Sequence, residues 1–216
     1  MRLFLVAAAL AFAPLATSAA TAGDIEAATA QYERGELAVA RAAFTRLSHR
    51  GVAAADYNLA VMHLRGEVPR ANGRDALQLM TRAAEGGFVT AMFSLAQMHE
   101  TGEVGLRVDL PTANRWYLRA AEAGSVDAQV AIATAYYLGR GAAKDSILAA
   151  RWYRVAAQGG DVGAMYLYAS MVEAGDGVAL DLNEARYWYG AAARNGDRAA
   201  PSKVEELDAK LGAAPG

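Results

Sequence analysis

A short segment built around a Trp-Tyr pair recurs along the chain at a constant interval. Trp116, Trp152 and Trp188, each followed by tyrosine, are the only tryptophans among the 216 residues, and successive copies lie 36 residues apart. A period of this length is typical of solenoids, in which similar supersecondary units stack one on the next. We therefore expect one array of repeats rather than one or two ordinary domains.

Each repeat reads as two helices joined by a loop. The regular units begin at Ala55, Ala91, Ala128 and Ala164. The first helix carries a small residue at Ala60, Ala96, Ala133 and Ala169, and should end at a left-handed glycine, namely Gly66, Gly102, Gly139 or Gly175. Good N-cap residues then precede the second helix: Asn72, Asp109, Asp145 and Asp181. The pattern predicts antiparallel helix pairs throughout the array.

Different segments flank the regular units. Residues 24–50 predict a shorter helical hairpin in which Asp24 caps the first helix and Gly35 breaks the chain. After Pro201, an apolar stripe over residues 202–211 predicts a capping helix. Arg2, the apolar run from residue 3 to 15 and the small residues 16–22 are typical of a secretory signal cleaved near residue 20 or 22. The apolar run is too short to span a bilayer.

Composition narrows the classes of function. The net charge is −2, which does not resemble the basic footprint of a nucleic-acid-binding protein. Cysteine is absent, so disulfides, thiol nucleophiles, cysteine-ligated metals and a lipid-modified cysteine are excluded. Hydrophobic residues make up 54% of the chain, too many for a disordered protein. The mature protein is expected to be a folded, exported chain.

With its motifs aligned, the repeat resembles the Sel1-like repeat, a relative of the tetratricopeptide repeat. The fourth unit carries the resemblance best, through Gly175-x-Gly177-Val178, Asp181, Trp188-Tyr189 and Gly196. The second unit lacks the second glycine after Gly102-Glu103-Val104, and the first has Leu79-Met80 in place of Trp-Tyr. The resemblance implies an all-α fold, a right-handed α-solenoid of antiparallel helix pairs that serves as an interaction scaffold.

This interpretation divides the chain into seven segments. They are a signal peptide (1–22), a tetratricopeptide-like capping hairpin (23–54), Sel1-like repeats 1 to 4 (55–90, 91–127, 128–163 and 164–199), and a C-terminal capping helix with its tail (200–216).

No set of residues in the sequence predicts catalysis, a cofactor or a metal. His63 and His99 hold equivalent positions in adjacent units and would supply two ligands to a shared metal, but no third ligand accompanies them. Packing is the preferred interpretation of both histidines. The Trp-Tyr pairs are likewise interpreted as packing residues, because a ligand site needs no copy in every unit. The protein is therefore expected not to be an enzyme.

A partner-binding surface is predicted where the repeats differ. In a tetratricopeptide-like superhelix the first helix of each pair lines the concave wall, and here that position varies from unit to unit. The predicted partner-binding residues are Tyr57, Phe93, Gln97, Glu100, Thr134, Tyr137, Tyr166, Ser170 and Glu173. Aromatic anchors beside polar groups suit a peptide segment or a partner helix. The alternative is that these residues pack against one another.

The predicted function is that of an exported scaffold or adaptor that binds a protein segment on this concave face. No nucleic acid and no stable membrane insertion after signal cleavage are expected. The expected location is the periplasm, with secretion left open. Two alternatives remain from other classes: a periplasmic regulator of an envelope sensor kinase or of cell-wall enzymes, and a cell-wall or β-lactam-interacting enzyme. The sequence names no partner.

Overall fold

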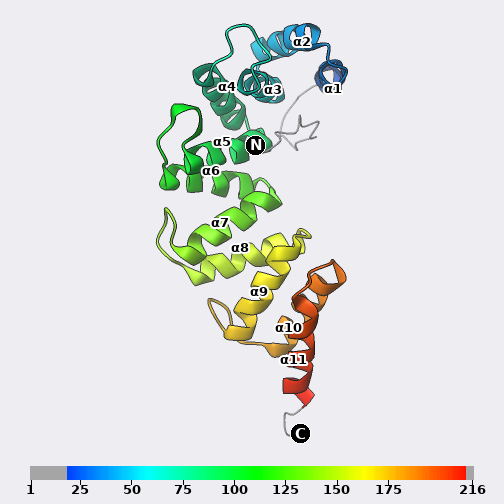
Figure 1. Cartoon of the computed structure of the whole chain (residues 1–216), viewed down its shortest axis with the longest axis vertical. Coiled ribbons are helices and arrows are strands. Elements are labelled where there is room, and N and C mark those ends of the chain that lie inside the picture. Colours follow the sequence, from blue (N-terminus) through cyan, green and yellow to red (C-terminus); the bar gives the residue numbers. More distant parts are fainter. Residues whose placement is uncertain (1–18, 213–216) are drawn as a thin grey trace. The chain divides into compact units, whose positions relative to one another are not determined.

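The computed structural model describes residues 19–212, and all of their regular structure is helical (Figure 1). The α-helices are α1 (Ala19–Glu33), α2 (Leu37–His49), α3 (Ala53–Leu64), α4 (Gly73–Glu85), α5 (Val89–Thr101), α6 (Leu110–Glu122), α7 (Val126–Leu138), α8 (Ser146–Gln158), α9 (Val162–Ala174), α10 (Leu182–Arg194) and α11 (Ala200–Gly212). One short 3₁₀ helix, η1 (Glu103–Gly105), lies between α5 and α6.

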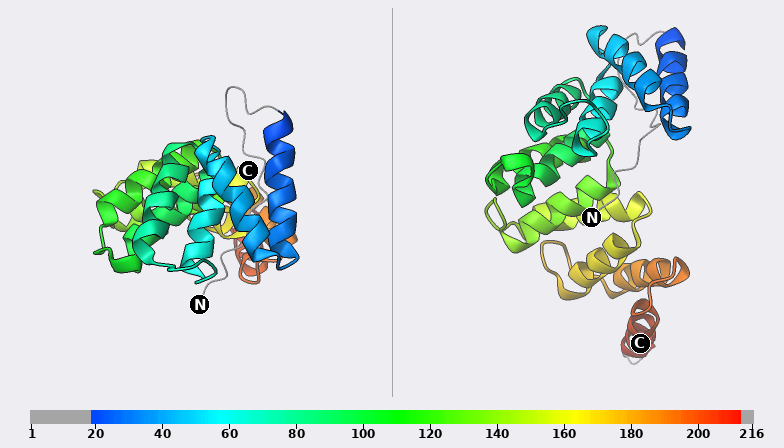
Figure 2. Two further views of the ribbon diagram at one scale, coloured as in Figure 1. Left: turned by 90° about the horizontal axis from the view of Figure 1, so that it is seen from above. Right: turned by 45° about the horizontal axis from the view of Figure 1, so that its top comes forward.

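The helices form two compact units, divided between Ala120 and Ala121. In the first unit, α1 packs on α2 and α3 packs on α4, and these pairs follow one another along the chain. In the second unit, α7 packs on α8 and α9 on α10, and α11 packs on α10 (Figure 2). These antiparallel pairs are the helical hairpins that the repeat predicts.

The predicted ends of the helices are confirmed. The four glycines that close the first helices have positive φ angles between 68° and 76°: Gly66, Gly102, Gly139 and Gly175. The four predicted caps of the second helices each accept a hydrogen bond from a backbone N–H of the first helical turn: Asn72, Asp109, Asp145 and Asp181. The second helix of every repeat therefore begins at a fixed place in the sequence.

Alanine fills much of the core in both units. The small residues that the pattern places at helix crossings, Ala60, Ala96, Ala133 and Ala169, are all fully buried. Because alanine has no side chain beyond Cβ, helix backbones can approach closely where it lies. Larger side chains, such as Phe44 in the first unit and Leu207 in the second, fill the remaining space.

The two residues of each Trp-Tyr pair differ in burial. The tyrosines Tyr117, Tyr153 and Tyr189 are buried, whereas the preceding tryptophans are only half-buried. The Trp188 ring packs edge-on against Tyr168 of α9, with 5.7 Å between ring centroids, and Arg119 lies 4.3 Å from the Trp116 ring. The tyrosine is therefore the core residue of the pair, and the tryptophan is partly exposed.

In one loop, a glycine allows the loop backbone to lie directly on the preceding repeat. In the second unit, a Cβ atom on Gly177 would stand 2.1 Å from the carbonyl oxygen of Ser146, at the start of α8. In the first unit, the equivalent loop of the second repeat has Val104, which adopts a φ of 52° and faces Gly73 at the start of α4. The loop of the second repeat thus has Val104 in place of glycine, and the helix start that it contacts has a glycine, Gly73.

The N-terminal end differs from the prediction in one respect. Asp24 does not cap a helix, because α1 already begins at Ala19; its carboxylate instead pairs with Arg50 at 2.9 Å. Most of the predicted signal peptide, residues 1–18, lies outside the described residues. Among the helices of residues 19–212, none combines the length and the apolar character that crossing a membrane requires.

Candidate partner-binding faces

The predicted binding residues lie in rows on the first helices of the repeats. Phe93, Gln97 and Glu100 follow one another at intervals of four and three residues on α5, and Tyr166, Ser170 and Glu173 do the same on α9. This spacing places each set of three on one helical face. All but Ser170, which is exposed, are half-buried, so each row presents a partly accessible surface on a rigid helix.

Tyr57 is the exception in the first unit. Only 2% of this residue is exposed, and its ring lies 5.1 Å from that of Phe88. Burial raises the pKa of its hydroxyl, while the hydrogen bond with Ser94 acts in the opposite direction. In this structure Tyr57 is a core residue, and its predicted contact with a partner stays a prediction.

The row on α5 contacts the second helix of the same repeat. The ring of Phe93 lies 5.5 Å from that of Tyr117, and the Tyr117 hydroxyl donates a hydrogen bond of 2.7 Å to Glu100 Oε2. Tyr117 is the tyrosine of the first Trp-Tyr pair. Both ends of the row are therefore held in place by one buried ring.

Thr134 and Tyr137 lie together on α7 in the second unit. Thr134 Oγ1 shares a hydrogen bond of 2.8 Å with the hydroxyl of Tyr153, the tyrosine of the next Trp-Tyr pair. The same oxygen donates to the Val130 carbonyl at 2.8 Å. The ammonium of Lys144 stands 5.6 Å from the centre of the Tyr137 ring, in cation–π range.

The row on α9 repeats the arrangement of α5. Tyr166 packs edge-on against Tyr189, with 5.0 Å between ring centroids, and the Tyr189 hydroxyl donates to Glu173 Oε2 at 3.0 Å. Burial and the bond to Glu173 raise the pKa of Tyr189 to about 12, and the hydrogen bond with Ser170 opposes them. The structure therefore brings Tyr166, Ser170 and Glu173 together around a single tyrosine.

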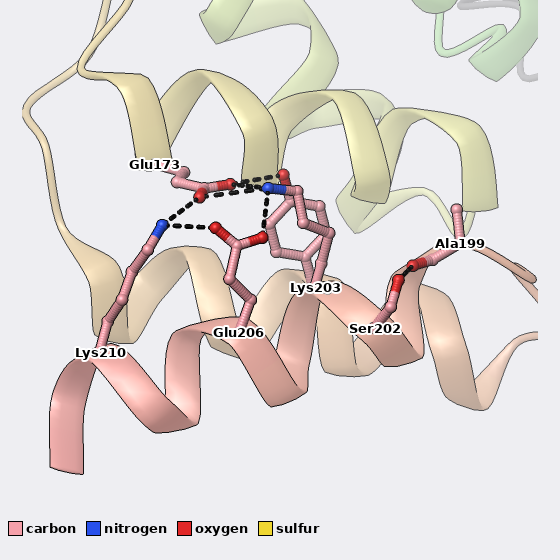
Figure 3. Close-up of polar contacts among 7 residues, drawn as sticks. Glu173, Ala199, Ser202, Lys203, Glu206 and Lys210 are labelled. Carbon is pink, nitrogen blue, oxygen red and sulfur yellow. Dashed lines mark hydrogen bonds and ion pairs between the residues drawn. The ribbon is translucent and has the colours of Figure 1, made fainter. Parts of the chain in front are cut away.

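Helix α11 covers one end of this row (Figure 3). Lys203 and Lys210 of α11 contact the Glu173 carboxylate at 3.1 and 3.2 Å, and Glu206 contacts Lys203 at 3.1 Å and Lys210 at 2.6 Å. Burial raises the pKa of Glu173, but hydrogen bonds from Lys203, Tyr189 and Lys210 outweigh it and lower the pKa below its ordinary value. Glu173 is therefore the centre of a charge-balanced cluster.

Sequence reasoning did not find these supporting contacts. The repeat pattern predicts only packing for the tyrosines of the Trp-Tyr pairs, whereas their hydroxyls also bond to Glu100, Thr134 and Glu173. A search for carboxylates 16 or 17 residues before each such tyrosine would have found Glu173 and Glu100. No comparable spacing in the sequence points to Lys203 and Lys210, which lie seven residues apart on one face of α11.

The two equivalent histidines lie in the first unit. His63 and His99 are half-buried, and burial is the main cause that lowers the pKa of His99, with Arg115 acting in the same direction and Asp109 opposing it. Within residues 19–212, no three side chains of the metal-ligating types gather in one place.

Solved structures share this arrangement of helix pairs. A Sel1 repeat protein from Oxalobacter formigenes is 30% identical, with a TM-score of 0.70 over 78% of this chain. The protective antigen c5321 of uropathogenic Escherichia coli, which displays an SLR fold, is 25% identical, with a TM-score of 0.78 over 90% of this chain. This chain covers 49% and 42% of those two chains, respectively. No curated protein matches it.

The expected fold class, an all-α solenoid of helix pairs, is confirmed by this likeness and by the described helices. A sequence profile described as the Sel1 repeat matches four consecutive segments, residues 53–88, 89–125, 126–161 and 162–197. These segments cover more than half of the chain, and each contains one of the first helices on which the predicted binding residues lie. The chain therefore belongs to the Sel1 repeat family.

Proposed function

We propose that this protein is an exported, non-catalytic scaffold that binds a protein segment on the predicted concave face, through the partly exposed rows of its first helices. Sel1 repeat proteins are protein-interaction scaffolds. The contact residues in this proposal are the half-buried and exposed members of the predicted set, led by Phe93 in the first unit and by Tyr137 and Tyr166 in the second. Binding is an equilibrium, with no turnover of the partner.

The observation that carries the proposal is the way each aromatic side chain is fixed. Phe93 and Tyr166 each pack against the tyrosine of a Trp-Tyr pair, and that tyrosine is tied to a glutamate on the same row. A ring that is already held in one position loses little conformational freedom when a partner covers it. A few residues carry most of the binding energy at protein interfaces, and aromatic anchors are prominent among them.

The polar groups of the rows favour recognition over catalysis. Glu173 is ionised more readily than an ordinary glutamate, because Lys203, Tyr189 and Lys210 donate hydrogen bonds to it. A carboxylate with a lowered pKa is a weak base at neutral pH. Thr134 Oγ1 already bonds to both Tyr153 and a backbone carbonyl, which suits a positioning role.

Site-specific photocrosslinking in the native cell tests the binding face. A photoreactive amino acid replaces Gln97 or Ser170, and Val39, which is exposed on α2, is the control position. We expect one discrete adduct from each row position and none from Val39. The adduct should weaken when Phe93→Ala or Tyr166→Ala is added. Equal adducts from all three positions, unaffected by these substitutions, would contradict the proposed face.

Export is tested separately by cell fractionation and by the mass of the purified mature protein. In the first 22 residues, Arg2 is followed by an apolar run and then by small residues. This pattern supports cleavage near residue 20 or 22. We expect the cleaved protein in the periplasmic fraction. An intact N-terminus in the cytosolic fraction would remove export from the proposal and leave the binding face untouched.

A further inference from the structure

Helix α11 lies against one end of the row on α9 in the way that a bound partner helix would (Figure 3). Lys203, Leu207 and Lys210 follow one another at intervals of four and three residues, so they lie on one face of α11. The ammonium groups of both lysines contact the Glu173 carboxylate. The ammonium of Lys203 also lies 5.9 Å from the centre of the Tyr189 ring. This face of α11 therefore has a positive charge at each end and an apolar side chain between them.

Leu207 is the apolar anchor of this face. Its side chain is fully buried and belongs to the same apolar cluster as Tyr189, with the partly buried Val204 beside it in that cluster. Ala200 is the other buried residue of α11, whereas α9 buries six of its thirteen residues. The contact of α11 with the second unit thus depends mainly on one large side chain and on ion pairs.

Most of these ion pairs are exposed to solvent. Lys210 and Glu206 each have 46% of the side chain exposed, and Arg186 and Asp208, which also join α10 to α11, are similarly exposed. Exposed ion pairs contribute little to stability, because water screens the charges and both side chains lose conformational freedom. Helices with few buried apolar contacts separate from a fold more readily than core helices do. We therefore expect α11 to open before α9 and α10.

Glu173 determines which kind of helix can take the place of α11. Only 16% of its side chain is exposed while α11 is seated, and Tyr189 is the hydrogen-bond donor that α10 supplies to it. A covered carboxylate without a cation is strongly unfavourable. A helix that covers Glu173 again must therefore bring positive charge, and a neutral or acidic helix does not restore the contact.

We propose that α11 is a built-in, displaceable occupant of the row on α9, and that the partner of this row is a helical segment of the same chemistry. The inference rests on the proposed function, because it names the partner of that site in the second unit. The partner helix carries two basic side chains seven residues apart, which pair with Glu173, and a large aliphatic side chain that takes the place of Leu207. Because α11 must first be released, the intact chain binds this partner more weakly than the uncovered row does.

Binding of a synthetic peptide to the full chain tests the proposal. The labelled peptide has the sequence of residues 199–212 and is added to the wild type or to Leu207→Asp, whose charged side chain cannot stay in the apolar cluster. We expect the peptide to bind Leu207→Asp at least about tenfold more tightly than the wild type, because α11 no longer competes. Equally weak binding to both chains, with α9 and α10 still protected from hydrogen exchange, overturns the proposal.

Two peptide variants of equal net charge show whether the basic face is recognised. Lys203→Gln with Lys210→Gln removes two positive charges from that face. Pro201→Glu with Ala209→Glu adds two negative charges at exposed positions of the same helix. For the chain with released α11, we expect the first pair of changes to weaken binding about tenfold and the second less than about threefold. Equal losses would mean that net charge alone decides, which overturns recognition by this face.

Hydrogen exchange of the wild-type chain tests displacement without any substitution. We expect the backbone amides of α11 to exchange at least about tenfold faster than those of α9 and α10, because α11 opens locally. Exchange of α11 at the same rate as α10 would show that α11 leaves only when the whole unit unfolds. That result overturns the proposal even if Leu207→Asp fails to fold.

Photocrosslinking from Ser170 separates this inference from the proposed function. In Leu207→Asp, the adduct from Ser170 should become stronger, whereas the adduct from Gln97, in the first unit, should stay the same. If both adducts form and neither changes, α11 masks nothing, and the proposed function stands without this inference. If neither adduct forms but the peptide binds as expected, the proposed function fails, while the row on α9 still accepts a basic helix. If the wild type forms a dimer that Leu207→Asp dissociates, the occupant is α11 of a second copy, which overturns a separate partner.

Discussion

The hydroxyl of Tyr189 donates a hydrogen bond to the carboxylate of Glu173, from the second helix of the last repeat to its first. Tyr117 and Glu100 are joined in the same way in the first unit. In both cases the tyrosine belongs to the repeating motif and the glutamate to the variable row. The tyrosine of the repeating motif therefore helps to fix the position of residues that differ between repeats.

The first prediction concerns the bond itself. Tyr189→Phe keeps the buried ring but removes the hydroxyl that Glu173 accepts from. We expect a loss of about 0.5–1.5 kcal/mol in the free energy of unfolding, because Lys203 and Lys210 still contact Glu173. Urea denaturation of the wild type and the variant measures this loss. A loss of several kcal/mol would mean that the hydroxyl has a further role in the core.

The second prediction compares the two residues of one Trp-Tyr pair. Tyr153 is 3% exposed and Trp152 is half-buried. Tyr153→Ala should lower the free energy of unfolding by about 3–5 kcal/mol, and Trp152→Ala by roughly half of that, because the cost follows the buried volume that is lost. Thermal and denaturant unfolding of the two variants check the order. The opposite order would show that the tryptophan is the main core residue.

The third prediction is a dependence on pH. The folded protein lowers the pKa of Glu173 below its ordinary value of 4.5. Ionised Glu173 therefore stabilises the fold fully above pH 4.5, and this contribution is lost as the pH falls below 4.5 through the folded pKa. The stability difference between the wild type and Glu173→Gln should be largest near pH 7 and shrink in acid.

Glu205 provides the control for this measurement. Glu205 is exposed on α11, and Glu205→Gln should change stability by no more than about 0.5 kcal/mol across the same pH series. If the difference between the wild type and Glu173→Gln stayed constant from pH 7 to pH 3, the cluster around Glu173 would not stabilise its ionised form.

The fourth prediction compares two glycines with positive φ. Gly160 has a φ of 95° and no atom within 4 Å of the place where a Cβ would lie, so Gly160→Ala should cost about 1–2 kcal/mol. Gly177→Ala adds a clash with the backbone of Ser146 and should cost roughly 3 kcal/mol or more. Melting temperatures rank the two variants. Equal losses would show that the loop moves away from α8 at little cost.

The sequence predicted the parts of this fold that depend on local chemistry. Gly175 ends α9 in the left-handed conformation, and Asp181 caps α10, because glycine and aspartate suit those places in any helix. The period of the Trp-Tyr pairs predicted an array of helix pairs, since each repeat must bury its apolar face against the next, and the described helices form such an array.

Contacts between distant segments could not be predicted in the same way. Asp24 was expected to cap a helix, but the chain upstream of it is also helical, and no local signal marks that start. The burial of Tyr57 and the contact of Lys203 with Glu173 depend on how neighbouring helices pack. Whether the rows bind a partner stays a prediction, because exposure and rigidity describe a surface and not its ligand.

Helix α11 also determines how this array can change in length. Ala200 follows Ala164 by 36 residues, so α11 has the place of a first helix, but Asp208 stands where α9 buries Val172. A carboxylate paired with Arg186 offers no apolar surface for another second helix. A duplicated copy of residues 164–199, inserted before Ala200, would leave that polar ending intact. Such an insertion would keep a copy of Arg186 opposite Asp208, so the contact between the last repeat and α11 would be preserved.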